Sequence, residues 1–294
     1  MIIVVVGPTA VGKTKMGVEL AKIYNGEIIN ADSMQIYKGL DVGTAKATKE
    51  EMQHIKHHLL SIKEVEEDYT VFDYQKDARE KIEEIKNKGK IPILVGGTGY
   101  YIKAVFYDYS FECEEDEDNK EYDEFSNEEL NRRIEEYECG FVYDKNNRKR
   151  MISLLKKLEN GWVPDNKDFK KIYDDVLFIG LTTDRDTLYK RINERFDKMV
   201  IPLIDEVKPY ALANVRSKAL MTGIGYKEFY PFFNNEDTLA NVVLECKKNS
   251  RNYAKRQYTW FNNQMDVEWF SVDFDNFDNT VGQVCEYIDS NRRA

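Results

Sequence analysis

The sequence lacks any long apolar run, which argues against a membrane protein. No stretch approaches the roughly 18 consecutive apolar residues that a membrane-spanning helix needs. The apolar start at residues 1–6 has no basic region before it and leads straight into a glycine motif, so we expect no signal peptide. We therefore expect a protein that does not contact the membrane.

Cysteine is scarce, and its spacing argues against two common roles. The four cysteines include no CxxC pair and lie far apart, at Cys113, Cys139, Cys246 and Cys285. Such spacing is typical of reduced thiols rather than of a disulfide framework or a zinc site. We expect a cytoplasmic protein.

An excess of positive charge is also missing, since the formal net charge is −10. Taken alone, this value would argue against a nucleic-acid partner. The charge is uneven, however: residues 112–124 carry nine acids and one lysine, whereas 145–157 carry six bases and 247–258 carry five bases, both without an acid. Because salt limits electrostatic reach to about 8 Å, a local basic face matters more than the total. The net charge therefore decides little about partners.

Strand and helix patterns alternate in the first third of the chain. Apolar runs at 2–6, 27–31 and 92–95 are typical of buried parallel strands, and the segments 13–24 and 72–88 have helical periodicity. This order predicts an α/β fold, a P-loop NTPase-like doubly wound parallel sheet. In such sheets ligands bind outside the carboxyl ends of the strands.

The pattern changes after residue 109 and returns to the sheet near residue 171. We expect a further core strand at 176–181, a helix at 184–199 with Asp184 or Thr183 as N-cap, and a long helix with a basic face at 239–261. The predicted domains are an α/β core at 1–109 and 171–294 and a mainly helical insertion at 110–170, which begins with a loosely solvated acidic stretch.

The strongest motif follows the first strand and matches GxxxxGK[ST] in full. It comprises Gly7, Pro8, Thr9, Ala10, Val11, Gly12, Lys13 and Thr14. The loop backbone and the following helix N-terminus supply N–H groups that bind phosphate. Lys13 can reach the phosphate, and the Thr14 hydroxyl can bind Mg²⁺. The motif predicts a site for a diphosphate or polyphosphate.

A Walker-B acid is missing from the expected position. The strand at 91–95 ends in Gly-Gly-Thr-Gly, which weakens the case for ATP hydrolysis without excluding it. Asp32, at the end of another strand, is the best candidate for a proton acceptor, although it could instead cap the next turn. Thr98 could donate a hydrogen bond to a substrate or phosphate oxygen, or could be a plain loop residue.

All three histidines fall close together, at His54, His57 and His58. A helix would place two of them on one face, where they could bind a metal. No carboxylate or cysteine lies at convincing spacing, so we expect a structural or substrate-contacting role and no metal there.

Bases and aromatic residues alternate at 251–261. Arg251, Lys255 and Arg256 could grip phosphates while the aromatic residues stack on nucleobases. A solvated helix face above a buried aromatic stripe is the alternative, and the pattern leaves both open.

Taken together, six segments resemble the tRNA dimethylallyltransferases, also called tRNA isopentenyltransferases or the IPP transferase family. The matching segments are 7–14, 30–46, 57–60, 92–101, 223–228 and 254–261. Their number, order and span of the chain make the resemblance highly specific. Eukaryotic relatives add a zinc finger. This sequence has no suitable Cys/His set after the basic helix, so it resembles the bacterial type.

The resemblance implies transfer of a dimethylallyl group from dimethylallyl diphosphate to N6 of adenosine 37, beside the tRNA anticodon. The P-loop would then hold the donor diphosphate, with Mg²⁺ bound by Thr14. Asp32 matches the family's general base and Thr98 its helper at the reaction centre. We expect a monomer with the tRNA anticodon stem-loop and dimethylallyl diphosphate as partners.

The same resemblance, together with the basic helix, implies a set of tRNA contacts. These residues are Asp32, Ser33, Met34, Gln35, Asn146, Asn147, Arg148, Lys149, Arg150, Arg251, Lys255 and Arg256. The chain departs from the family at 143–150, where a His-Pro pair is absent, and at Pro202, where the family has glycine. These departures put individual tRNA contacts in doubt but not the reaction.

Three other functions remain open. An adenylate dimethylallyltransferase would prenylate free AMP, although AMP needs neither the insertion nor the basic helix. A P-loop kinase for a small metabolite would turn over ATP. A non-catalytic RNA-binding protein would need neither Asp32 nor Thr98.

Overall fold

The computed structural model describes residues 1–108, 122, 124–137, 143, 145–159 and 170–292. Most of the acidic stretch at 112–124, Cys113 and Cys139 lie outside the described residues. The chain forms two compact units, one from Met1–Tyr109 with Lys171–Ala294 and the other from Ser110–Lys170.

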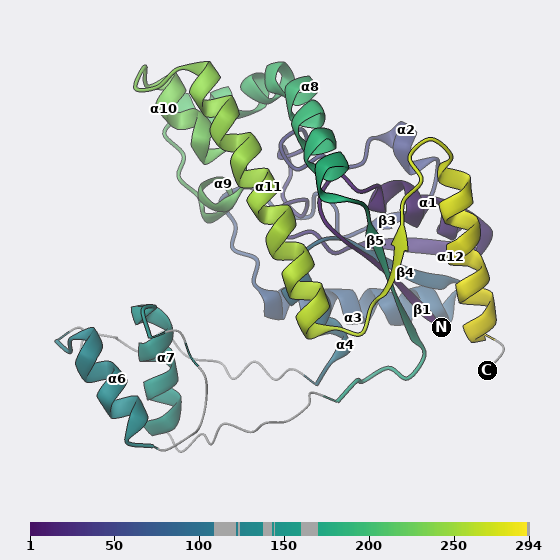
Figure 1. Cartoon of the computed structure of the whole chain (residues 1–294), viewed down its shortest axis with the longest axis horizontal. Coiled ribbons are helices and arrows are strands. Elements are labelled where there is room, and N and C mark those ends of the chain that lie inside the picture. The colour runs from purple at the N-terminus through teal and green to yellow at the C-terminus, as the bar shows by residue number, and fades with distance from the viewer. Residues whose placement is uncertain (109–121, 123, 138–142, 144, 160–169, 293–294) are drawn as a thin grey trace. The chain divides into compact units, whose positions relative to one another are not determined.

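The larger unit is built on a six-stranded sheet with the order β3-β2-β4-β1-β5-β6. All its neighbouring strands are parallel. The strands are β1 (Ile2–Val6), β2 (Gly26–Asn30), β3 (His57–His58), β4 (Ile91–Val95), β5 (Val176–Thr182) and β6 (Glu268–Ser271) (Figure 1). The strand order reverses at β1, which lies between β4 and β5, and this confirms the predicted doubly wound α/β fold.

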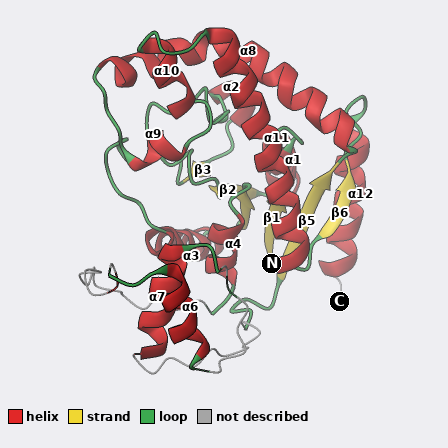
Figure 2. Ribbon diagram, turned by 60° about the vertical axis from the view of Figure 1, so that its left-hand side comes forward, coloured by secondary structure: helices red, strands yellow, loops and turns green. Residues whose placement is uncertain are grey.

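Helices pack on both faces of this sheet (Figure 2). Alternate residues of β1 face opposite sides, so Ile3 and Val5 pack with one apolar cluster while Val4 and Val6 pack with the other. The first cluster includes residues of α1 (Lys13–Ile23) and α12 (Phe277–Arg292), and the second includes residues of α3 (Val71–Asn87) and α4 (Gly99–Phe106).

Further helices of the larger unit come mainly from the second half of the chain. They are α2 (Lys49–Met52), α8 (Arg185–Leu212), α9 (Lys218–Thr222), the 3-10 helix η1 (Lys227–Phe229), α10 (Tyr230–Phe233) and α11 (Leu239–Gln264). Among the described residues, none of the helices combines the length and the apolar character that a membrane crossing requires.

Helix α8 is longer than the sequence predicted. Asp184 is its N-cap, as expected, and its side chain accepts a hydrogen bond from the Thr187 backbone N–H at 2.9 Å. The helix continues beyond residue 199 and contains Pro202 and Pro209. Each proline removes one backbone N–H donor. The buried residues Leu203, Val207 and Ala211 recur every fourth position, so packing maintains the helix across both prolines.

The three histidines lie outside the helices. The helical face that could have brought two of them together does not form, because α2 ends before them and His57 and His58 form β3. His58 Nε2 lies 2.7 Å from Glu27 Oε2, whereas His57 Nδ1 lies 2.9 Å from the Ile55 carbonyl oxygen.

The smaller unit contains α6 (Asn127–Glu135) and α7 (Arg148–Glu159) in its described part. Buried apolar residues of the two helices pack on each other, namely Leu130, Ile134, Met151, Leu154, Leu155 and Leu158. This small core gives the unit an apolar centre of its own.

Candidate active site

The P-loop links β1 to α1 at the carboxyl edge of the sheet. Gly12 immediately precedes α1 with φ +105°, a left-handed conformation that favours glycine. No acidic residue lies in the first turn of α1 to oppose the positive end of its dipole. The Lys13 ammonium folds back and donates a hydrogen bond to the Pro8 carbonyl oxygen at 2.7 Å. The loop therefore has the backbone of an anion site.

A cavity of about 420 Å³ opens at this edge. Its lining carries the ammonium or guanidinium groups of Lys13, Lys15, Arg191, Arg195 and Lys198 and the carboxylates of Asp32, Glu51 and Glu194. Five cationic side chains against three anionic ones favour a negatively charged ligand. The volume lies within the range of roughly 300–1,000 Å³ typical of small-molecule sites.

Three of these charged groups, Lys13, Asp32 and Arg195, are half-buried and shift one another's pKa. Burial lowers the pKa of Lys13 to about 8; Asp32 opposes this shift and Arg195 adds to it. Burial likewise lowers the pKa of Arg195 to about 10. Burial raises the pKa of Asp32, against the opposing effects of the Met34 backbone N–H, Lys13 and Arg195. A bound anion would compensate the surplus positive charge.

Arg191 and Arg195 are site residues that the sequence interpretation missed. Arg195 donates to the Thr9 hydroxyl oxygen at 2.6 Å, and Arg191 Nε donates to the Ala10 carbonyl oxygen at 3.1 Å. They lie four residues apart on α8 and so share one helix face. Their spacing was visible in the sequence, but a charged pair at that interval is more often a solvated helix face.

Asp32 and Thr98 meet because β2 and β4 are neighbours in the sheet, with Asn30 paired to Val95. The Thr98 hydroxyl oxygen accepts a hydrogen bond from the Ser33 backbone N–H at 3.0 Å. Asp32 lines the cavity, and its Oδ1 also accepts from the Met34 backbone N–H at 3.0 Å. The turn-capping role of Asp32 thus exists alongside its position at the cavity.

Gln257 of α11 bridges two loops of the site and was also missed. Its Oε1 accepts a hydrogen bond from the Thr9 backbone N–H at 2.8 Å, and its Nε2 donates to the Gly97 carbonyl oxygen at 3.0 Å. The side chain is 4% exposed. Gln257 therefore joins the P-loop to the loop after β4.

The bases of α11 point in different directions. Lys255 and Arg256 are exposed, with the Arg256 guanidinium 5.7 Å from the centre of the Tyr253 ring. Arg251 instead donates to Asn193 Oδ1 on α8 at 2.8 Å. Phe261 is fully buried, as the alternative of a buried aromatic stripe required. Only part of the predicted basic face therefore remains accessible on this helix.

The bases of the smaller unit divide in the same way. Asn147 Oδ1 accepts from the Arg150 backbone N–H at 3.2 Å and so caps α7. The Arg148 guanidinium donates to the carbonyl oxygens of Phe125 at 2.6 Å and Tyr122 at 2.9 Å. Asn146, Lys149 and the Arg150 side chain are exposed. Asn147 and Arg148 thus have structural roles whether or not they contact RNA.

A magnesium ion fits this site only as a partner of the ligand. Within the described part of the chain, no group of three or more His, Cys, Asp or Glu side chains could hold a metal ion. Mg²⁺ is commonly bound through one or two protein oxygens and substrate phosphates. Thr14 lines the cavity, and its hydroxyl together with diphosphate oxygens would form such a set.

Replacement of Gln257 by alanine should lower the free energy of unfolding by about 2 kcal/mol, because it leaves the buried Gly97 carbonyl and the partly buried Thr9 N–H without these partners. Urea denaturation measures the change. Lys255→Ala, an exposed change on the same helix, should stay within about 0.5 kcal/mol of the wild type. Equal unfolding free energies for the two variants would contradict the bridging role.

Comparison with known proteins adds independent information. Residues 35–264 match the model of the family described as IPP transferase. A tRNA dimethylallyltransferase of Anoxybacillus flavithermus is 43% identical over 98% of this chain and 96% of its own length. The enzyme of the same name from Bacillus subtilis is 43% identical over 92% of this chain and 90% of its own length.

Solved structures agree with these relatives. A tRNA delta(2)-isopentenylpyrophosphate transferase from Staphylococcus epidermidis matches with a TM-score of 0.75 and 37% identity, over 100% of this chain and 99% of its own. A eukaryotic dimethylallyltransferase acting on tRNA matches with a TM-score of 0.83 and 27% identity, over 97% of this chain and 77% of its own. This chain belongs to the IPP transferase family.

Proposed function

We propose that the protein transfers a dimethylallyl group from dimethylallyl diphosphate to N6 of adenosine 37 in the tRNA anticodon loop, releasing diphosphate. The observation that carries this proposal is the cavity that places the P-loop, two α8 arginines and the Asp32 carboxylate at one sheet edge. The membership of the chain in the IPP transferase family supports the same reaction. The site is assembled within one chain, which supports a monomer, and we propose that it acts in the cytoplasm.

The cationic half of the cavity suits the donor. The allylic carbon can carry positive charge, so stabilising the departing diphosphate is half of the catalytic task. P-loop N–H groups, Lys13, Arg191 and Arg195 would stabilise the negative charge that develops as the C–O bond breaks. When bound through Thr14 and the diphosphate, Mg²⁺ supplies further positive charge.

The carboxylate half suits the acceptor. The adenine amine is a poor nucleophile, because its lone pair is delocalised into the ring. As its nitrogen forms the bond to the allylic carbon, Asp32 would accept the amine proton. Burial raises the pKa of Asp32, which makes the carboxylate a stronger base when it is ionised. Thr98, bonded to the backbone of the next residue, Ser33, would help to orient the reaction centre.

The acceptor base must leave its stack to reach this cavity. Unstacking costs a few kcal/mol and is easiest in a loop. Residues 32–35 would meet the extruded base. The exposed Lys255 and Arg256 of α11 and residues 146–150 of the smaller unit would bind the phosphates of the anticodon stem-loop.

One assay separates this reaction from its rivals. Labelled dimethylallyl diphosphate is offered with unmodified tRNA, with the same tRNA carrying guanosine at position 37, or with AMP. Label should enter only the unmodified tRNA. Label in AMP but never in tRNA would establish the adenylate enzyme, and ATP turnover without prenyl transfer would establish the kinase.

Asp32→Asn should slow transfer by at least about 100-fold, because the amide cannot accept the proton. The affinity for tRNA should change little, and single-turnover transfer with a parallel binding measurement tests both. Asp205→Asn removes the same charge from an exposed position on α8 and should leave transfer intact. A normal transfer rate in Asp32→Asn would refute the assigned role.

Binding of inorganic diphosphate at pH 8 should take up protons at Lys13. Part of the Lys13 population is the neutral amine at this pH, since burial lowers its pKa to about 8, and a bound anion favours the charged form. Affinity should therefore weaken as the pH rises above 8. Calorimetry in two buffers of different ionisation enthalpy measures the uptake. Lys13→Met reports the protons of the ligand alone, and equal uptake in both proteins would contradict the expectation.

Changing Lys255 and Arg256 together to alanine should weaken tRNA binding and reduce its logarithmic salt slope by about 1 to 2. Fluorescence anisotropy between low and moderate salt measures the slope. The matched control changes two other lysines, Lys86 and Lys88, to alanine. They lie at the C-terminal end of α3, shortly before the start of β4. An unchanged slope in the α11 variant would show that its bases face away from the RNA.

A further inference from the structure

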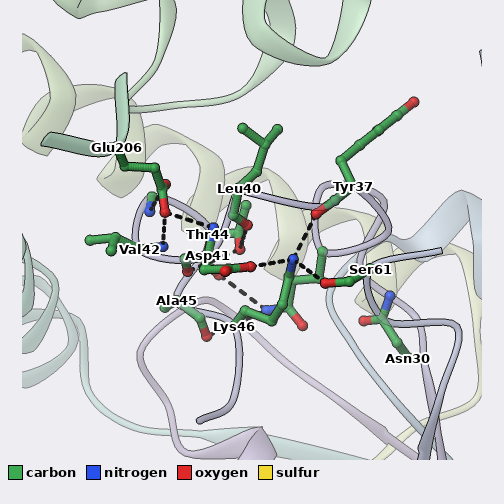
Figure 3. A network of polar contacts seen from close by, with 12 residues as sticks. Asn30, Tyr37, Leu40, Asp41, Val42, Thr44, Ala45, Lys46, Ser61 and Glu206 are labelled. Atoms are coloured by element: carbon green, nitrogen blue, oxygen red, sulfur yellow. Dashed lines mark hydrogen bonds and ion pairs between the residues drawn. The ribbon is translucent and has the colours of Figure 1, made fainter. Parts of the chain in front are cut away.

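The loop that follows β2 is bonded from outside by one carboxylate of α8. Glu206 Oε2 accepts hydrogen bonds from the backbone N–H groups of Asp41 at 2.9 Å and Val42 at 2.7 Å (Figure 3). Glu206 Oε1 accepts from the backbone N–H of Gly43 at 3.1 Å. Oε1 also accepts from the Tyr226 hydroxyl at 2.7 Å. Four donors therefore converge on a single side chain.

This arrangement is a backbone anion site occupied by the protein's own carboxylate. Successive N–H groups that point into one concavity bind anions, and bonds to an ionised acceptor are about twice as strong as neutral ones. The Tyr226 side chain is fully buried and closes the site. A Cβ on Gly43 would lie 2.6 Å from the Tyr226 ring, so the close approach requires glycine at this position.

A second set of bonds makes the loop rigid from within. The Lys46 ammonium donates to the Tyr37 carbonyl oxygen at 2.7 Å, to Asp41 Oδ1 at 2.6 Å and to Ser61 Oγ at 2.8 Å (Figure 3). Its side chain is only 6% exposed. These bonds lie within the loop and its neighbour Ser61, whereas the hydrogen bonds to Glu206 join residues 41–43 of the loop to α8.

The rigid loop holds a residue of the cavity. Gln35 Nε2 donates to the Thr44 carbonyl oxygen at 3.1 Å, and Gln35, Thr44 and Ala45 all line the cavity with Asp32. The other atom of this amide, Gln35 Oε1, is a hydrogen-bond acceptor of the kind a ligand N–H requires. Thr44 directly follows residues 41–43, whose N–H groups bond to Glu206. Glu206 is therefore linked to Gln35 through the backbone of residues 41–44 and the bond from Gln35 to Thr44.

We propose that Glu206 is a positioning residue for the acceptor base, which rests on the proposed transfer to tRNA. Through the backbone of Asp41 to Gly43 it sets Gln35 at the cavity, where an extruded base would place its exocyclic amine. Arg195 lies on the same helix, roughly three turns before Glu206. Helix α8 thus connects Arg195 at the proposed diphosphate site with Glu206 at the loop of residues 41–43.

Glu206→Gln tests this role while keeping the size of the side chain. Its amide has one acceptor oxygen, and its NH₂ group would face backbone donors. The KM for tRNA should rise at least tenfold, whereas the KM for dimethylallyl diphosphate should stay within twofold, because the P-loop and its arginines are unchanged. Hydrogen exchange of the amides of Asp41, Val42 and Gly43 should become faster.

Asp205→Asn, which removes the same charge one residue earlier on α8, should leave both KM values and the exchange unchanged. If Glu206→Gln fails to fold, Tyr226→Phe removes one donor to the carboxylate and should raise the KM for tRNA two- to threefold. An unchanged KM for tRNA, or an equal rise in both KM values, would overturn the proposal. Failure of the proposed function is distinct, since the wild type would then transfer nothing to tRNA.

Discussion

The site depends on one electrostatic constraint, the partial burial of Lys13 and Arg195 beside a half-buried carboxylate, Asp32. Burial opposes the charged form of each group, as the lowered pKa values of the two cations and the raised pKa of the acid indicate. Two half-buried cations with one half-buried anion leave a surplus of positive charge. A diphosphate would neutralise this surplus, which explains why a P-loop serves a donor whose phosphates are the leaving group.

Two long helices from the second half of the chain, α8 and α11, contribute side chains to this site. Helix α8 brings Arg191 and Arg195 onto the P-loop, and α11 inserts Gln257 between the P-loop and the loop after β4. The same helices carry Glu206 and the exposed bases Lys255 and Arg256. The proposed donor site, the loop bonded to Glu206 and the proposed RNA contacts Lys255 and Arg256 therefore all involve α8 or α11.

Much of the sheet could be predicted from the sequence. Apolar β-branched runs identified β1, β4 and β5, and the rule that ligands bind at the carboxyl ends of strands brought Asp32 and Thr98 to one edge. The P-loop was recognisable because its chemistry is local in sequence. The roles assigned to Asp32 and Thr98 remain proposals.

The residues that sequence reasoning missed act across long distances in the chain. Gln257 contacts Thr9, and Glu206 contacts Asp41, so neither contact leaves a local pattern. The length of α8 was hidden by Pro202 and Pro209, which packing of the buried stripe overrides. The helical face that could have paired two histidines does not form, because Gln53 and His54 adopt positive φ and α2 ends before His57.

The central claim is that the P-loop holds a diphosphate that departs intact. The most direct test is a single-turnover reaction of the protein with dimethylallyl diphosphate and unmodified tRNA, in which released diphosphate, orthophosphate and modified adenosine are counted together. One diphosphate should appear for each dimethylallyl group transferred, with no orthophosphate and no requirement for ATP. Orthophosphate release, or transfer that depends on ATP, would contradict the account.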